Sequence, residues 1–161
     1  MSKRIVYAVA AVLKKTAAGD EVLVVKRPDE DPDLGGYWGF PATPLKPGEL
    51  PEAAVVRACR EKLHCKATPV RLLGIMLQRH ADFDMYFMDI EVVLAAGEEP
   101  DVHAAVTQGT AYVGQKWSID PNDLIASAKA GSCCSSIFLT DRGLLERDEW
   151  IASLEDSDAV A

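Results

Sequence analysis

Four side chains between positions 49 and 62 could take part in the chemistry of a phosphorylated ligand. Glu49 and Glu61 are carboxylates, the ligand type that Mg²⁺ and Mn²⁺ prefer, while Arg57 and Lys62 are cations that pair with phosphate oxygens. Taken alone, such residues are equally consistent with surface ion pairs on a helix, which contribute only about 0.3 to 0.5 kcal/mol each. Their spacing has to decide between these two interpretations.

Residues 51–64 are predicted to form the helix that presents most of these groups, because Pro51 suits a first helical turn and Glu49 places an acid near its N-terminus. At about 100° per residue, one face collects the apolar side chains Val55, Val56, Cys59 and Leu63. The side chains expected roughly opposite are Arg57, Arg60 and His64. The flank between these faces holds Ala54, Ala58, Glu61 and Lys62. Several acids on such a flank could bind a divalent cation, but Glu61 is the single acid there.

The rest of the chain is predicted to form a mixed β-sheet covered by helices, an α+β sandwich. Strands are expected at 4–13, 21–27, 70–80, 84–96 and 111–119, and further helices at 121–131 and 135–154. A long loop at 28–50, rich in Pro, Gly and Asp, contains one short strand at 37–40, and loops of this length in a compact domain tend to be functional. Residues 1–150 then form a single domain, followed by a frayed acidic tail at 151–161.

The composition argues against several classes of protein. The chain has 161 residues, a formal charge of -8 and a pI of about 4.8, whereas non-specific binding to nucleic acid needs a basic face. No apolar run is long enough to span a membrane, and the apolar run at 4–13 is interpreted as a strand rather than a signal peptide. The cysteines form no C-x-x-C pattern, which is typical of a reduced, cytoplasmic protein.

The stretch 43–65 resembles the signature of the Nudix family, G-x5-E-x7-R-E-U-x-E-E-x-G-U, in which U is an aliphatic residue. The spacing is kept without insertion, and the charged residues that match are Glu49, Arg57 and Glu61. The preceding residues 38–41 resemble the W-x-F-P that leads into the signature, and WSIDPNDL at 117–124 is similar to a region of many members. The resemblance covers most of the chain and implies a Nudix-type α/β/α sandwich with a mixed β-sheet.

The signature is degenerate at the positions that bind metal in the family. Thr43 replaces the opening glycine, Ala58 and Lys62 replace glutamates, and His64 replaces the glycine near the helix end. The resemblance implies that Glu61 is the surviving helix ligand for Mg²⁺ or Mn²⁺, with weak or absent metal binding. Lys62 could instead neutralise phosphate charge itself. The acids that could supply a further ligand or base from outside the signature are Asp82, Asp84, Glu98, Glu99 and Asp101.

Two functions from different classes follow from this resemblance. The first is hydrolysis of the pyrophosphate bond in a nucleoside diphosphate linked to another moiety, with impaired or altered metal chemistry. Its catalytic-site residues would be Glu61, Arg57 and Glu49, of which Arg57 and Glu49 could also be purely structural. The second is a catalytically inactive domain that binds a nucleotide ligand or a protein partner.

The nucleotide-like ligand would be bound by three residues, namely Lys62, Arg27 and Trp38. Trp38 could stack on a base, and Arg27 could contact phosphate, although a core aromatic residue and an ordinary surface charge are the alternative interpretations. A homodimer is compatible with the sequence, which leaves the substrate and the oligomeric state open.

Overall fold

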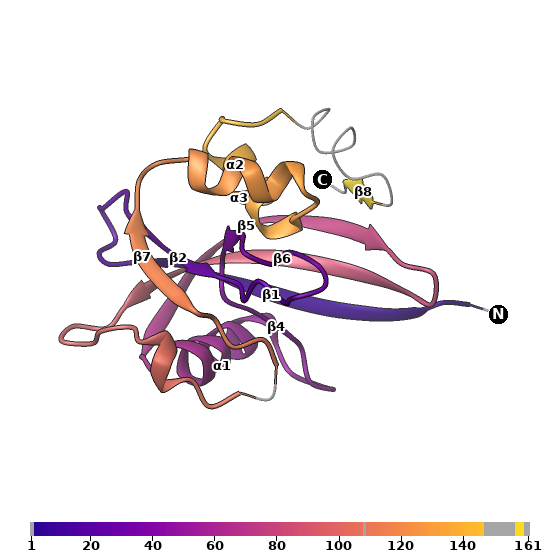
Figure 1. Ribbon diagram of the computed structural model, residues 1–161. Coiled ribbons are helices and arrows are strands. Elements are labelled where there is room, and N and C mark those ends of the chain that lie inside the picture. The colour runs from indigo at the N-terminus through magenta and orange to yellow at the C-terminus, as the bar shows by residue number, and fades with distance from the viewer. Residues whose placement is uncertain (1, 108, 147–156, 160–161) are drawn as a thin grey trace.

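The computed structural model describes residues 2–107, 109–146 and 157–159, and contains a mixed β-sheet with helices on both faces. Helix α1 (Pro51–Leu63) covers one face, whereas α2 (Asn122–Lys129) and α3 (Cys133–Asp141) cover the other (Figure 1). This arrangement confirms the predicted α+β sandwich. No helix in the described part of the chain is both long enough and apolar enough to cross a membrane.

The sheet combines parallel and antiparallel pairs. Its strands are β1 (Arg4–Lys14), β2 (Val22–Lys26), β3 (Trp38–Gly39), β4 (Ala42–Pro44), β5 (Ala67–Arg79), β6 (Phe83–Leu94), β7 (Gly114–Ser118) and β8 (Ser157–Ala159). They follow the order β3-β2-β1-β6-β5-β8, with β4 paired to β1 and β7 paired to β2. Strands β1 and β6 are parallel, and the other pairs are antiparallel. A 3-10 helix, η1 (Val102–Ala104), precedes β7.

Several element ends differ from the prediction. Strand β5 begins at Ala67 rather than at 70, because an irregularity in its pairing with β6 accommodates Pro69. Strand β7 begins at Gly114 rather than at 111, and the predicted helical stretch 135–154 is helical only as far as Asp141 in its described part. Of the predicted frayed tail, 157–159 pairs with β5 as β8, and the remainder lies outside the described residues.

The two halves of the sheet separate where β1 and β2 diverge. These strands are paired at Lys14 and Val22, and further along β1 pairs with β4 while β2 pairs with β3. The loop predicted to contain one short strand therefore contains two, one on each side of the opening. Because β3 and β4 pair with different strands, the loop at 28–50, which was expected to be functional, lines the opening between the two halves.

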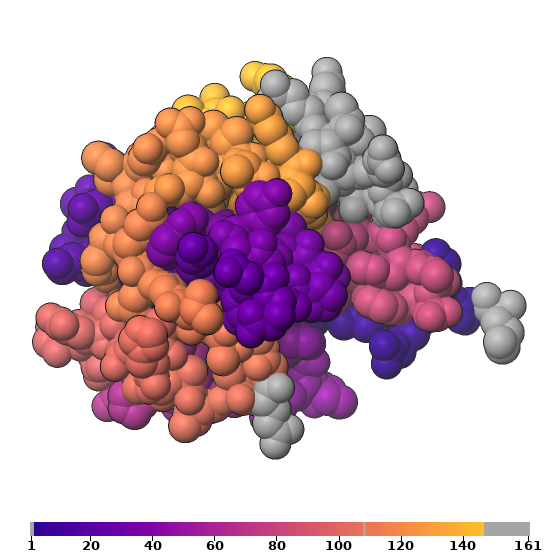
Figure 2. Space-filling model, in the orientation of Figure 1, coloured from indigo at the N-terminus to yellow at the C-terminus, as the bar shows by residue number. Residues whose placement is uncertain are grey.

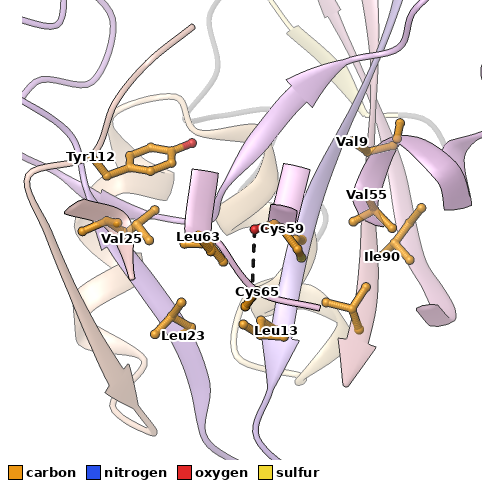
Figure 3. Close-up of a cluster of buried hydrophobic side chains, with 14 of the residues drawn as sticks. Val9, Leu13, Leu23, Val25, Val55, Cys59, Leu63, Cys65, Ile90 and Tyr112 are labelled. Carbon is orange, nitrogen blue, oxygen red and sulfur yellow. Dashed lines mark hydrogen bonds between the residues drawn. The ribbon is translucent and has the colours of Figure 1, made fainter. Parts of the chain in front are cut away.

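From Ala8 onward both faces of β1 are buried, since α1 packs on one face and the two other helices pack on the other. Val9 and Leu13 belong to one cluster with Val55 and Leu63 of α1, shown in Figure 3, whereas the alternate residues of β1 join the cluster beneath α2 and α3. A strand that is covered on both sides is typically a continuous apolar run, as residues 8–13 are. The predicted stripe of α1 is buried except at Val56, which is only partly buried.

Arg57 fixes α1 to β4 through its guanidinium group. Its N–H groups donate to the two carboxylate oxygens of Glu49 at 2.8 and 2.9 Å and to the carbonyl oxygen of Pro44 at 2.8 Å. Two longer bonds of 3.3 Å reach Thr43 Oγ1 and Glu61 Oε2. The expectation that Arg57 lies opposite the core was wrong: its side chain is 10% exposed, because it turns towards β4 and finds its partners there.

The flank of α1 is also more buried than the helical projection indicates. Ala54 and Ala58 are fully buried and Lys62 is 5% exposed, whereas Glu61 is partly exposed. Ala54 belongs to the core cluster, and at the C-terminal end of α1 the segment around η1 covers the helix, with backbone N–H groups at Asp101 and Val106 that donate to the carbonyl oxygens of Leu63 and Glu61 at 2.7 Å. This tertiary cover closes a surface that the helix alone would leave open.

His64 ends α1 in a left-handed conformation, with φ 51° and ψ 40°. The N–H of Cys65 then donates to the carbonyl oxygen of Cys59 at 3.3 Å, a bond typical of helix ends that usually contain glycine. Among the described residues His64 is the one non-glycine residue with a positive φ. Its side chain therefore imposes a conformational penalty of about 1 kcal/mol, which the buried contacts of α1 offset.

Lowering the pH should destabilise the protein by protonating Glu49. The bonds from Arg57 lower the pKa of Glu49 from 4.5 to about 2. Its contribution to the free energy of unfolding is therefore complete above about pH 5 and is lost as the pH falls towards 2; its full size is about 2 to 3 kcal/mol. Urea unfolding of the wild type and of Glu49→Gln should show a difference that shrinks as the pH falls, and a pH-independent difference would contradict this assignment.

Replacing His64 by glycine should stabilise the protein. His64→Gly removes the side chain that disfavours the left-handed conformation, and we expect the free energy of unfolding to rise by about 0.5 to 1 kcal/mol. His64→Ala is the control, because alanine retains the Cβ atom and its penalty. Equal stability of the two variants in denaturant unfolding would show that the backbone conformation is not the cause.

Candidate functional site

A cleft of about 850 Å³ lies at the opening between the two halves of the sheet. Its walls come from the loop after β2, from β3 and β4, from the adjoining ends of β5 and β6, and from the connection between α2 and α3. In Figure 2 the purple segment that follows β2 lies at the centre of the molecule's face, between the orange helices and the salmon loop before β7. Segments far apart in the sequence therefore contribute to one site.

Aromatic side chains form much of the wall of this cleft. Trp38 and Phe87 line it, together with His80 and Phe83, whose rings stack with their centroids 4.2 Å apart. Flat rings of this kind offer a surface on which a further planar group can stack. Trp38, one of the three predicted ligand-binding residues, therefore lies in the cleft, where Lys116 Nζ is 4.5 Å from the centroid of its ring.

Arg27 and Tyr112 form a polar part of the cleft lining. Arg27 Nε lies 3.6 Å from Asp31 Oδ2, and the guanidinium group has no other ion pair or hydrogen bond to the described residues. The Tyr112 hydroxyl accepts a hydrogen bond from the Ala42 N–H at 3.1 Å. Burial raises the pKa of Tyr112 to about 12, so its hydroxyl stays neutral and ties the chain before β7 to β4.

The three predicted catalytic residues meet at the Arg57 guanidinium group. Glu49 and Arg57 bind each other and β4, which keeps the loop in place, and this pairing raises the pKa of Arg57. Glu61 is the most exposed of the three, with 26% of its side chain accessible. Only one Glu61 oxygen accepts a bond from Arg57, so the other can take a proton or bind a cation.

Lys62 does not line the cleft but contacts a residue that does. Its Nζ is 5.2 Å from the centroid of the Tyr112 ring, and Tyr112 itself lines the cleft. Burial, followed by the charge of Arg27, lowers the pKa of Lys62 to about 8; Glu61 opposes this shift and Arg57 adds to it. The ammonium group therefore lies against the Tyr112 ring, within the electrostatic influence of two arginines and one glutamate.

The described residues do not fit a resident divalent metal ion. Mg²⁺ and Mn²⁺ need several oxygen ligands, and no three Asp, Glu, His or Cys side chains converge in the part of the chain that the structure describes. Glu61 is shared with Arg57, the buried Ala58 has no ligand atom, and the Lys62 ammonium adds positive charge beside them. The donor set therefore disfavours the expected cofactor.

The acids outside the signature do not complete the set. Asp84 lies 3.4 Å from Lys3 Nζ, and Asp101 Oδ1 accepts a bond from the backbone N–H of His103 at 2.9 Å. The remaining three candidates, Asp82, Glu98 and Glu99, form no metal-binding cluster with described residues either.

Sequence reasoning did not single out Tyr112, His80 or Phe83 as ligand-binding residues. Tyr112 joins the cleft to α1, and the other two form the stacked wall. They come from a predicted strand, a strand end and a short link, where nothing in the local pattern distinguishes a wall of a cleft from core. The one available signal for a ligand-binding wall was the position of aromatic rings at strand ends, as at His80 and Phe83.

The sequence matches the model of the NUDIX domain over residues 5–126. The fold is similar to the MutT protein from Methanosarcina mazei Go1, with 13% identity, a TM-score of 0.62, and 89% of this chain and 96% of that chain covered. It is also similar to the E. coli ORF135 protein, with 20% identity, a TM-score of 0.61, and 87% and 92% covered. A C. elegans Ap4A hydrolase is similar as well, with 17% identity, a TM-score of 0.59, and 86% of this chain and 95% of that chain covered.

Comparison with curated proteins gives no match. Structural similarity at such low identity establishes a common fold and leaves the activity to be argued from the site. The family match runs from β1 into α2, so it includes the Arg57 interactions and most of the cleft. The chain therefore belongs to the Nudix family.

Proposed function

We propose that the protein acts on a nucleoside diphosphate linked to another moiety and cleaves its pyrophosphate bond. The observation that carries this proposal is an aromatic-walled cleft that is lined by Arg27 and adjoins Lys62 through Tyr112. A planar base and a diphosphate group are the two chemical parts that such a junction suits. Family membership supports the reaction class, and one similar structure is named an Ap4A hydrolase.

Each part of the site has a distinct task in this proposal. The aromatic wall, including Trp38, holds the base, and Arg27 and Lys62 neutralise the phosphate oxygens. Hydrolysis requires water to attack phosphorus, and Glu61 is the carboxylate that would accept the proton. Arg57 and Glu49 position Glu61 and the β4 loop and need not touch the ligand.

Nudix hydrolases generally use divalent metal ions, and the poor fit of the described residues to such an ion favours a second candidate function. In this alternative the domain binds the same class of ligand without cleaving it. The two candidates share the cleft and differ only in whether Glu61 and the cations lower the barrier to hydrolysis enough for turnover.

Hydrolysis of a panel of nucleoside diphosphate derivatives tests the first candidate. We expect slow release of a nucleoside monophosphate, reduced by about 10- to 100-fold in Glu61→Gln because that variant cannot accept the proton. Glu52→Gln, which changes an exposed acid in the first turn of the same helix, is the matched control and should retain activity. No turnover of any compound, together with ligand-induced stabilisation in a thermal-shift screen, would favour the binding module instead.

Removal of the Trp38 ring should weaken binding of the nucleoside part. Trp38→Ala should lower the affinity for an accepted compound by about tenfold or more, because stacking on an aromatic ring contributes about 1 to 3 kcal/mol per base. Trp38→Phe should retain most of this affinity, measured by titration calorimetry. Since Lys116 contacts the same ring, Lys116→Met separates loss of stacking from loss of that contact. Unchanged affinity in Trp38→Ala would place the base elsewhere.

A further inference from the structure

Lys62 carries a buried charge that makes no direct ion pair with the described residues. The residue is 5% exposed, and among the described residues its ammonium group has an aromatic contact with Tyr112 but no ion pair or hydrogen bond. Burying an unpaired ammonium group is strongly unfavourable, so such a group is normally retained where an anion or another function requires it. An unpartnered cation in the interior therefore indicates a ligand of opposite charge.

The charges around Lys62 also favour a bound anion. Arg27 and Arg57 lie close enough to repel the Lys62 charge, whereas Glu61 attracts it. The Glu61 carboxylate is itself engaged by Arg57 at 3.3 Å, and Arg57 is further neutralised by Glu49. What remains unneutralised is Lys62 together with the N–H groups of Arg27 that Asp31 does not bind. An incoming anion would relieve the repulsion between these two cations.

Geometry connects this charge to the cleft. Tyr112 lines the cleft and also contacts the Lys62 ammonium, and Arg27 lines the same cleft. Gly109 passes next to the ammonium group: a Cβ atom at that position would lie 3.7 Å from Lys62 Nζ. The two cations come from different segments, Arg27 from the residue that follows β2 and Lys62 from α1, and each can pair with phosphate oxygens.

We infer that Lys62 and Arg27 form a diphosphate-binding site that needs no divalent cation. Lys62 supplies as a fixed charge what a metal ion supplies in other members of the family, and Arg27 adds donors in the planar arrangement that suits phosphate oxygens. The identification of the bound group as part of a nucleoside diphosphate derivative rests on the proposed function, but the diphosphate site itself does not.

Titration calorimetry with inorganic pyrophosphate in a buffer containing EDTA tests this inference. The wild type should bind pyrophosphate, and both Lys62→Met and Arg27→Met should bind it about tenfold or more weakly. Lys66→Met, which removes an exposed lysine and so causes the same change in net charge, is the control and should bind like the wild type. Arg57 is unsuitable for this series because its removal would release β4.

A second measurement separates a ligand-binding role from a structural one. Methionine fills a volume similar to that of the lysine stem and removes an unpaired buried charge, so Lys62→Met should have an equal or higher melting temperature without ligand. Pyrophosphate should then raise the melting temperature of the wild type and leave that of Lys62→Met unchanged. A destabilised Lys62→Met protein that still binds pyrophosphate normally would overturn the inference.

Three further outcomes would also overturn it. These are binding of pyrophosphate only after Mg²⁺ is added, equal binding of orthophosphate, and equal affinity of the wild type and Lys62→Met. The proposed function fails separately: if no nucleoside compound binds or is cleaved but pyrophosphate binds in EDTA, the inference stands without it. If nucleoside compounds are cleaved only with metal and pyrophosphate does not bind in EDTA, the proposed function stands and the inferred diphosphate site is wrong.

Discussion

The guanidinium group of Arg57 joins three parts of the chain that would otherwise be independent: helix α1, strand β4 and the loop between them. Its bonds to Glu49 and to the Pro44 carbonyl oxygen fix the path of that loop, and its bond to Glu61 orients the carboxylate that faces outward. These interactions satisfy buried polar groups whether or not a metal ion is present. That independence gives Glu49, Arg57 and Glu61 a structural role that needs no metal ion.

The position of β4 in turn determines the shape of the cleft. Strand β4 pairs with β1 on one side of the opening, and the Ala42 N–H binds the Tyr112 hydroxyl, which holds the chain before β7 in place. The segment around η1 then covers the end of α1 through backbone hydrogen bonds. Burial of Lys62 is a consequence of this closure, since nothing in α1 itself would shield the ammonium group. The Arg57 interactions that hold β4 in place are thus part of the same packing that buries the Lys62 charge beside the cleft.

The sequence predicted those features that depend on local periodicity. The sequence predicted the apolar stripe of α1 at Val55, Cys59 and Leu63, because this stripe follows from a helical repeat. It also predicted the order of the elements and the family spacing, which depend on periodic patterns and on fixed separations along the chain. The burial of Arg57 and Lys62 was not predicted, because it depends on partners from β4 and from the segment around η1 that are distant in the sequence. The cleft likewise depends on the divergence of β1 and β2, for which the loop gave no signal beyond its length.

A fixed lysine and an exchangeable metal ion have different energetic consequences for a phosphate site. A metal ion arrives with its ligand or from solution, so the empty protein does not have to bury its charge. A lysine in the same place keeps the charge in the empty protein, which is destabilised by it, but the charge is already oriented when the ligand binds. Such preorganisation favours the ground-state complex as much as the transition state unless further groups act on the reacting phosphorus. If Lys62 binds phosphate as we infer, the site is therefore expected to favour recognition of a diphosphate over its hydrolysis, and tight binding with slow turnover is the combination that it suits.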